Sequence, residues 1–390
     1  MIDRQQTGLV RRARRTLAVA VAALMALSST ALVVHDQGVG NGGRTLVVSG
    51  ARRHFDEAAA LQLADVTTTT TSTTSPPPPP TTAPPAPPTT ARPAPKPAPR
   101  PTTTVARPAG TLSAARLKPP AVPVGLAPYV GLGTWSDVYD WSNSYTNGHP
   151  GTGPADVDQM AAKGVQTLYI QASKWDAPGD LVDPDLLMPI LRRAKERGLR
   201  VVAWYLPTLT DPQRDLDRMV AMARLADVDS VAVDIESRTV SDVNDRNHRL
   251  IQFSQALRQA LPGRTIGAIA LPPVVLEVVN PDYWPNFPYK EIAPSYDVWM
   301  TMGYWTNRKA SSGYRDAYRY TRENVERLRV DVGRADLPVH PIGGLGQGTT
   351  AADVEAYRKA AIDTTSIGGS LYDWRTTAGE CWTGLAGFRA

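Results

Sequence analysis

Residues 183–206 read DPDLLMPILRRAKERGLRVVAWYL and contain the pattern that decides the fold. The first part opens with Asp183-Pro184, a typical helix start, and ends at Gly198, where a helix C-terminus is expected. The last eight residues are almost continuously apolar, which is typical of a strand that is buried on both faces of a parallel sheet. This helix-then-strand unit is the building block of an α/β domain.

The same unit recurs from residue 125 to residue 390. Eight apolar segments have the composition of strands, and amphipathic stretches with helix-start residues, such as Thr349-Thr350, separate most of them. Eight units favour closure into a (β/α)8 TIM barrel over an open doubly wound sheet, and no glycine-rich phosphate loop follows the first strand. The predicted strands are 128–135, 165–172, 199–206, 229–236, 264–271, 296–304, 338–344 and 366–374.

The first 124 residues differ from the barrel region in composition. Of the 35 prolines in the chain, 18 lie between Val66 and Pro123, among many threonines and few large apolar residues. Such a segment buries too little surface to fold, so 66–124 is predicted to be a disordered, extended stalk. Residues 35–65 form a short linker region to which we assign no function.

Residues 16–34 carry no charge and follow a basic tail, 1–15, that contains Arg11, Arg12, Arg14 and Arg15. Positive charge before an apolar run orients the N-terminus towards the cytoplasm. The run has the length of a transmembrane anchor, and a cleaved signal segment is the alternative. We therefore expect an extracytoplasmic barrel, held at the cell membrane by a single pass or secreted if the segment is removed.

Charge and cysteine content exclude several classes of function. Residues 1–124 hold 14 Lys and Arg against 5 Asp and Glu, whereas 125–390 hold 28 against 32, so the basic charge belongs to the tail. A mildly acidic barrel without a basic stripe does not indicate nucleic-acid binding. Cys381 is the single cysteine, and the five histidines show no metal-ligand spacing. We expect a monomer without metal or cofactor.

The active site of a TIM barrel lies at the carboxyl ends of its strands. Asp234 and Glu236 are the most informative residues there, because positions i and i+2 of a strand face the same side. Two neighbouring acids push their pKa values apart, so that one can serve as a general acid. The alternative is a structural carboxylate pair bound to Arg or Lys. The other strand ends offer Trp135, Tyr205, Tyr304, Trp305, Asp373 and Trp374, and aromatic faces of this kind suit sugar rings.

The segment 229–236, DSVAVDIE, resembles the D-G-x-D-x-D-x-E motif of the family 18 glycoside hydrolases, the chitinases and their relatives. Met302-Gly303-Tyr304 is similar to the M-x-Y motif of that family, and Trp374 to its tryptophan at the end of strand 8. The resemblance implies that Glu236 protonates the glycosidic oxygen and that Asp234 and Tyr304 hold the N-acetyl group of the substrate. It also implies that Trp374 stacks beneath the sugar.

The sequence departs from the family 18 pattern at several positions. Ala232 stands where the family has its middle Asp, Ser230 replaces a Gly, Trp305 replaces an acid, and the S-x-G-G motif of strand 3 is absent. These departures put the rate and the pH optimum in doubt. A family 25 muramidase-like arrangement also accommodates the strand-4 acids. It lacks a matching acid on strand 1, since Asp137 lies two residues beyond the predicted strand end.

The sequence therefore predicts an envelope glycosidase-like barrel that acts on an N-acetylhexosamine-containing glycan, such as peptidoglycan or a chitin-like polymer. A non-catalytic wall-glycan binding barrel on a stalk is the rival hypothesis. Both hypotheses predict an aromatic groove, but only the first requires Glu236 to act as an acid. A barrel displayed for protein partners is a third hypothesis, without a positive feature in the sequence.

Overall fold

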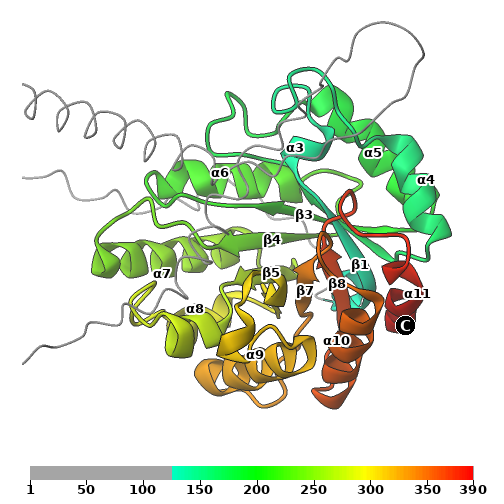
Figure 1. Ribbon diagram of the computed structural model, residues 1–390. Helices are drawn as coiled ribbons and strands as arrows, with labels where there is room; N and C mark the ends of the chain where they lie inside the picture. The colour runs from blue at the N-terminus through cyan, green and yellow to red at the C-terminus, as the bar shows by residue number, and fades with distance from the viewer. Residues whose placement is uncertain (1–124, 390) are drawn as a thin grey trace, which may run out of the picture.

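The computed structural model describes residues 125–389, which form one barrel of eight parallel strands surrounded by helices (Figure 1). The strands are hydrogen-bonded in the order β6-β5-β4-β3-β2-β1-β8-β7, so that chain neighbours are also sheet neighbours. Their bounds are β1 Gly131–Ser136, β2 Thr167–Gln171, β3 Arg200–Tyr205, β4 Ser230–Ile235, β5 Ile266–Ala270, β6 Val298–Thr301, β7 Ile342–Leu345 and β8 Gly368–Tyr372.

Two short parallel bridges close the ring between β6 and the β7 segment. Trp299 pairs with Val339 just before β7, and Met302 just after β6 pairs with Ile342. The amide of Gly303 also donates to the carbonyl oxygen of Ile342 at 2.8 Å. The predicted (β/α)8 barrel is therefore confirmed, and each of its eight strands overlaps one of the eight predicted segments.

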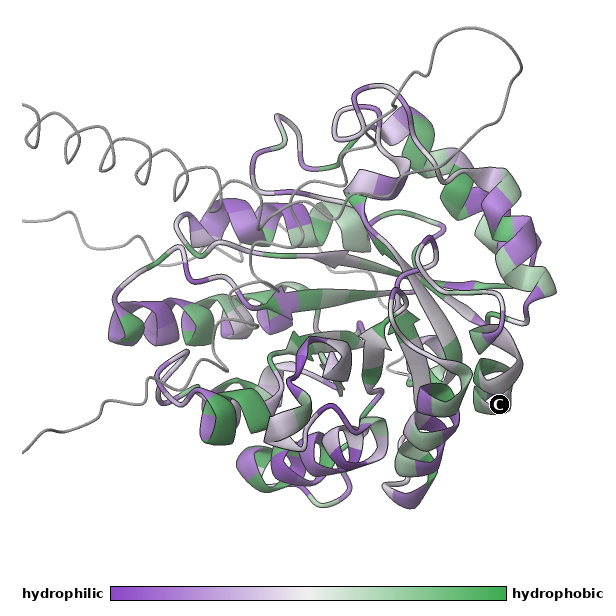
Figure 2. Ribbon diagram, viewed as in Figure 1, coloured by the Kyte–Doolittle hydropathy of each residue, from purple (hydrophilic) through white to green (hydrophobic). Residues whose placement is uncertain are grey.

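Helices cover the outside of the barrel, and most alternate with the strands along the chain. Their outer surfaces carry hydrophilic residues, while the strands are mostly hydrophobic (Figure 2). The start signal predicted at Thr349-Thr350 acts as a cap: Oγ1 of Thr350 accepts a hydrogen bond from the amide of Asp353 at 3.1 Å. The bounds are α3 Val138–Trp141, α4 Pro154–Ala162, α5 Pro184–Glu196, α6 Pro212–Ala223, α7 Val243–Ala260, α8 Tyr289–Ile292, α9 Ala317–Val332, α10 Ala351–Asp363 and α11 Cys381–Leu385.

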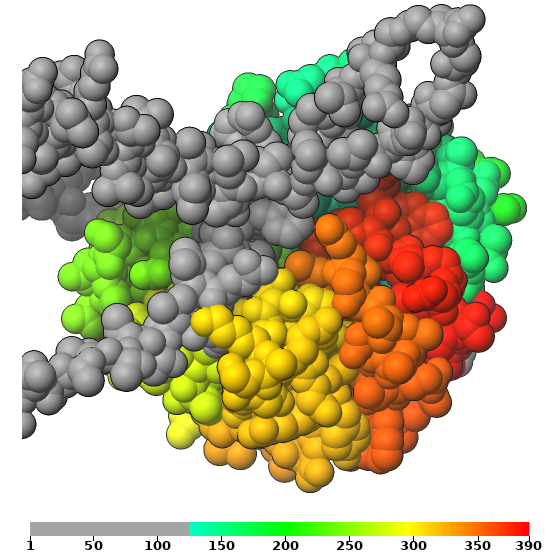
Figure 3. Space-filling view, in the orientation of Figure 1, coloured from blue at the N-terminus to red at the C-terminus, as the bar shows by residue number. Residues whose placement is uncertain are grey.

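The first and last strands of the barrel lie side by side, since β1 pairs with β8. In the space-filling view the last residues, in red, lie against a teal part of the chain from early in the described range (Figure 3). Among residues 125–389, no helix combines the length and apolar character needed to cross a membrane. The predicted tail 1–15, apolar segment 16–34, linker 35–65 and stalk 66–124 lie outside the described residues.

Candidate active site

The carboxyl ends of the strands meet at one end of the barrel, which we call the mouth. Asp234 is the last but one residue of β4, and Glu236 directly follows the strand. Their side chains are buried, at 6% and 9% exposure. Ala232 shares their face one step deeper in the barrel and is fully buried. The strand-4 acids therefore occupy the floor of the mouth.

Two neighbouring tyrosines also lie at the mouth. Tyr304 follows β6 and Tyr372 ends β8, and their ring centroids are 6.1 Å apart. Burial raises the pKa of Tyr304, and the nearby charges of Glu236 and Asp234 raise it further. Its phenol is therefore neutral at physiological pH and available as a hydrogen-bond donor beside both carboxyl groups.

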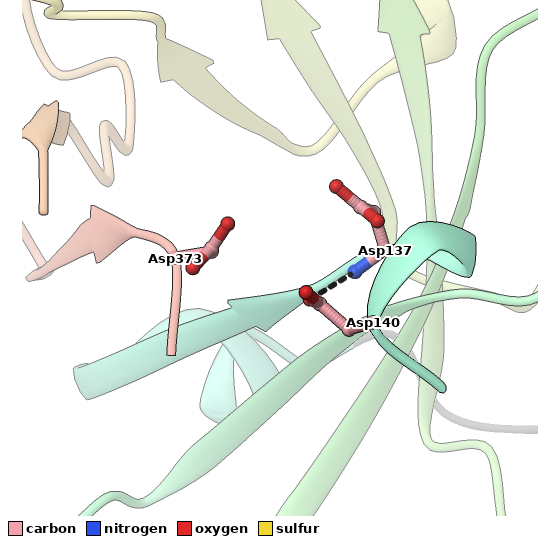
Figure 4. Close-up of side chains that lie close together, drawn as sticks. All are labelled: Asp137, Asp140 and Asp373. Atoms are coloured by element: carbon pink, nitrogen blue, oxygen red, sulfur yellow. Dashed lines mark hydrogen bonds between the residues drawn. The ribbon is translucent and has the colours of Figure 1, made fainter. Parts of the chain in front are cut away.

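Three further acids gather where β1 and β8 end (Figure 4). Asp137 follows β1, Asp140 lies in α3, and Asp373 follows β8; one carboxylate oxygen of each lies within 4.8 Å of the others. The hydroxyl of Tyr372 donates to Oδ2 of Asp137 at 2.6 Å. The charges of Asp373 and Asp137, like those of the strand-4 pair, raise the pKa of Tyr304, so acids of both groups lie near the same tyrosine.

The crowding of these acids changes the protonation of Asp140. Burial raises the pKa of its carboxyl group well above the usual range, and the neighbouring charges of Asp137 and Asp373 add to this effect. Oδ2 of Asp140 accepts from the amide of Asp137 at 3.1 Å and from the hydroxyl of Ser136 at 3.2 Å. We therefore expect Asp140 to hold a proton at neutral pH. Three carboxyl groups at this spacing are also the oxygen ligands that a hard divalent cation prefers.

The loop that carries two of these acids, residues 137–153, is fastened to the next βα unit. Asp183, directly before α5, accepts hydrogen bonds from the hydroxyl of Ser142 at 2.5 Å and from the amide of Ser144 at 2.8 Å. Asp183 was predicted to begin a helix, and α5 does begin at Pro184. Its carboxylate, however, binds this loop and makes no side-chain cap of the helix.

Three aromatic residues predicted to contact substrate are covered by protein. Trp135, at 1% exposure, stacks on Tyr169 with centroids 4.4 Å apart. Tyr205 is fully buried, and its hydroxyl donates to Asp215 at 2.5 Å. Trp305 is also fully buried, with its ring 5.4 Å from that of Tyr357. In this structure their rings pack the barrel and offer no face to a sugar.

Trp374 differs from these three because it is only partly buried. It lies just after Asp373, and its indole nitrogen donates to Oδ1 of Asp156 at 3.3 Å, near the start of α4. Its amide is held by the carbonyl oxygen of Trp135 at 2.9 Å. The role of Trp374 as a sugar platform stays a prediction, and its position at the edge of the mouth is compatible with it.

The structure thus brings Asp234, Glu236, Tyr304 and Asp373 together and adds residues that the sequence analysis passed over. Asp137 was set aside because strand 1 was expected to end at residue 135. β1 extends to Ser136, so Asp137 follows it directly. The signal for Asp140 was its position three residues after Asp137, where the two form a reciprocal capping box at the start of α3.

No family model and no curated protein matches the sequence. Among solved structures, the GH5_18 protein of Streptomyces cattleya in complex with Manb1-4GlcNAc is similar with a TM-score of 0.52 and 15% identity, over 66% of this chain and 79% of that one. A class V chitinase of Pseudomonas fluorescens Pf-5 has a TM-score of 0.49 and 10% identity, over 67% and 100%. The spore cortex-lytic enzyme SleL of Bacillus cereus has 0.49 and 10%, over 68% and 76%. The first similarity establishes a shared barrel fold.

Proposed function

We propose that the barrel is a glycoside hydrolase that acts on an N-acetylhexosamine-containing glycan of the cell envelope, such as peptidoglycan or a chitin-like polymer. The observation that carries the proposal is the meeting of Asp234, Glu236 and Tyr304 at the mouth, with both acids buried and the tyrosine partly buried. A carboxyl pair beside a neutral phenol offers a proton donor, a negative charge and a hydrogen bond to one sugar.

The reaction that fits these groups is substrate-assisted hydrolysis, which needs no second carboxylate as nucleophile. Glu236 gives its proton to the glycosidic oxygen as the bond from that oxygen to the anomeric carbon breaks. The carbonyl oxygen of the N-acetyl group forms a bond to the same carbon, while Asp234 and Tyr304 hold the acetamido group. Water then attacks the anomeric carbon, the bond from that carbon to the acetamido oxygen breaks, and the attacking water gives a proton to the carboxylate of Glu236, with net retention of configuration.

Asp137 supports a second arrangement at the same mouth. A family 25 muramidase-like site combines an acid after strand 1 with the strand-4 pair, and the position of Asp137 directly after β1 meets that requirement. Its hydrogen bond from Tyr372 orients the carboxylate in the cluster. Both arrangements address N-acetylhexosamine glycans, but only the second makes Asp137 essential. A barrel that binds glycan without turnover is the remaining rival.

The deciding experiment compares the full chain with its Glu236→Gln variant on purified peptidoglycan and on chitin hexamer. Glutamine keeps the shape of Glu236 and removes the proton, so turnover should fall by about 10²–10⁴-fold, the usual contribution of general acid–base catalysis. Glycan binding should persist. Glu291→Gln, an exposed acid on α8, is the matched control and should leave both unchanged.

The pattern across variants separates the three hypotheses. Loss of turnover in Glu236→Gln but not in Asp137→Asn supports substrate-assisted hydrolysis, and comparable loss in both supports the muramidase-like arrangement. Binding of glycan by the unmutated chain, without product across pH values of about 4–8, would reject the enzyme hypothesis. Trp374→Ala should weaken binding, because a stacking face is lost, and mass spectrometry of released fragments identifies the linkage that is cut.

A further inference from the structure

We propose that Trp175, supported by Lys174, Tyr139 and Tyr145, forms a distal glycan-binding platform at the rim of the mouth. The platform would contact sugar units away from the cleaved bond. This inference rests on the proposed function, because it concerns the same glycan. Its ligand class is an extended N-acetylhexosamine chain, which a site confined to the floor of the mouth would contact over fewer units.

The distribution of tryptophan exposure first identifies this residue. All nine tryptophans lie within the described residues, and seven of them are buried. Trp374 is partly buried, whereas Trp175 is 55% exposed. Single exposed apolar residues are common on protein surfaces, so exposure alone would carry no conclusion. The surroundings of Trp175 carry the argument.

The backbone at Trp175 is held by a buried arginine from the neighbouring α6. Nη2 of Arg218, a residue with 4% exposure, donates to the carbonyl oxygen of Trp175 at 3.0 Å and to that of Ala177 at 3.1 Å. The loop is also closed by a hydrogen bond from the amide of Val182 to the carbonyl oxygen of Ala172 at 3.0 Å. The exposed indole is thus carried by an ordered loop, which reduces the entropy cost of binding.

The side chains around the indole form an ordered cluster. Nζ of Lys174 lies 5.2 Å from the ring centroid of Trp175, 4.8 Å from that of Tyr145 and 5.9 Å from that of Tyr139. The same ammonium group pairs with Asp176 at 2.7 Å, and the hydroxyl of Tyr145 donates to Asp176 at 2.8 Å. Lysine–aromatic contacts and an ion pair therefore fix three rings around one cation.

The platform adjoins the acids of the mouth through the loop 137–153. Tyr139 lies between Asp137 and Asp140 in the chain, and its amide donates to Oδ1 of Asp137 at 2.6 Å. Trp175 itself follows β2, the strand that pairs with β1. A glycan that enters the mouth can therefore continue over this loop to the indole. The flat ring suits the apolar face of a pyranose, and Lys174 and Asp176 can bind its polar groups.

The test measures how affinity depends on glycan length in a chain that does not turn over. In full-length protein carrying Glu236→Gln, chitin dimer and hexamer are titrated with and without Trp175→Ala. The hexamer should bind about tenfold more weakly without the indole, which equals about 1.4 kcal/mol. The affinity for the dimer should be unchanged, and Trp175→Tyr should restore most of the hexamer affinity because it keeps an aromatic face.

Matched controls are Val330→Ala and Ile362→Ala, which remove apolar side chains of 76% and 58% exposure from α9 and α10. Neither should change the affinity for the dimer or the hexamer. In the active chain, Trp175→Ala should raise KM for long glycans and leave kcat unchanged. Equal hexamer affinity with and without the indole, or equal loss for dimer and hexamer, would overturn the platform. If the platform is overturned in this way but Glu236 still supports glycan turnover, the proposed function stands. If the unmutated chain binds none of these glycans, both the platform and the proposed function are rejected.

Discussion

The barrel contains two buried polar regions, and they differ in how their polar groups are compensated. Nearer the N-terminal ends of the strands, neutral groups satisfy one another: the hydroxyl of Tyr129 bonds to Ser230 at 2.9 Å, and the ring of His340 bonds to the carbonyl oxygen of Tyr129 at 2.8 Å and to Ser370 at 3.0 Å. We call this set the lower network. At the mouth, by contrast, five acids gather in two groups, and four of them lie near Tyr304.

From this difference we propose that the lower network serves stability and that the mouth serves the proposed chemistry. In the lower network, burial lowers the pKa of His340 to about 4, so a neutral imidazole can satisfy both neighbours without charge. At the mouth, burial and like charges raise the pKa of Asp140, so the folded state holds a proton against its ordinary tendency. Strongly shifted carboxyl groups in a concave site are typical of functional sites.

The largest expected effect comes from adding a carboxylate at Ala232, one step below the acids of the mouth and towards the lower network. Ala232 lies in register with Trp204, whose ring stands 6.0 Å from that of Trp135, and all three residues are buried. Ala232→Asp would introduce an acid at the position where the family 18 motif has one, and would place it against indoles. We expect a loss of about 3–5 kcal/mol in the free energy of unfolding, as for an uncompensated buried charge.

Urea denaturation measures this loss, with the exposed Ala352→Asp on α10 as the control. An unchanged free energy of unfolding in Ala232→Asp, together with faster glycan turnover, would show that the layer accepts a third acid. The acidic part of the mouth would then extend deeper into the barrel than Asp234. In that case Ala232 would be a loss from the active site. The packing of Trp204 instead indicates that a small residue is needed at position 232.

A smaller effect is expected from removing the imidazole of the lower network. His340→Ala leaves Ser370 without one partner and opens a cavity, so the free energy of unfolding should fall by about 2–3 kcal/mol. Because the folded pKa is depressed, the stability that depends on the neutral imidazole is present above the unfolded pKa of about 6.5. It is lost as the pH falls towards about 4.

The variant should lack that acid dependence, and denaturation curves at pH 7 and pH 4.5 measure it. The exposed His248→Ala on α7 provides the control. If turnover by the folded His340→Ala protein drops as far as in Glu236→Gln, the lower network takes part in the chemistry. The assignment of stability to the lower network and of chemistry to the mouth would then be wrong.

The same division explains how far the sequence could predict this molecule. The eight strands were recognisable because buried parallel strands are continuously apolar, and Asp234 and Glu236 followed from the two-residue period of β4. Burial of Trp135, Tyr205 and Trp305 was not predictable, since a ring near the end of a strand can turn inward or outward. The acid cluster depended on the end of β1, and an error of one residue there hid Asp137.

The smallest effect, when expressed per pH unit, concerns the proton held by Asp140. Its folded pKa is raised above the unfolded value of about 4, so the folded state binds more protons than the unfolded state between those two values. The free energy of unfolding is therefore highest below pH 4 with respect to this group. It should decline as the pH rises towards the folded pKa, by at most about 1.4 kcal/mol per pH unit for one proton.

Asn at position 140 mimics the protonated acid, so Asp140→Asn should flatten this decline and stabilise the protein at neutral and alkaline pH. The control Asp336→Asn, at a side chain of 83% exposure, should leave the slope as it is. An equal slope in wild type and Asp140→Asn would mean that the three acids share no proton, and a bound cation at Asp137, Asp140 and Asp373 would then be the simplest way to balance their charge. Chelator-sensitive stability in the wild type alone would identify that cation, because asparagine weakens one of its three ligands.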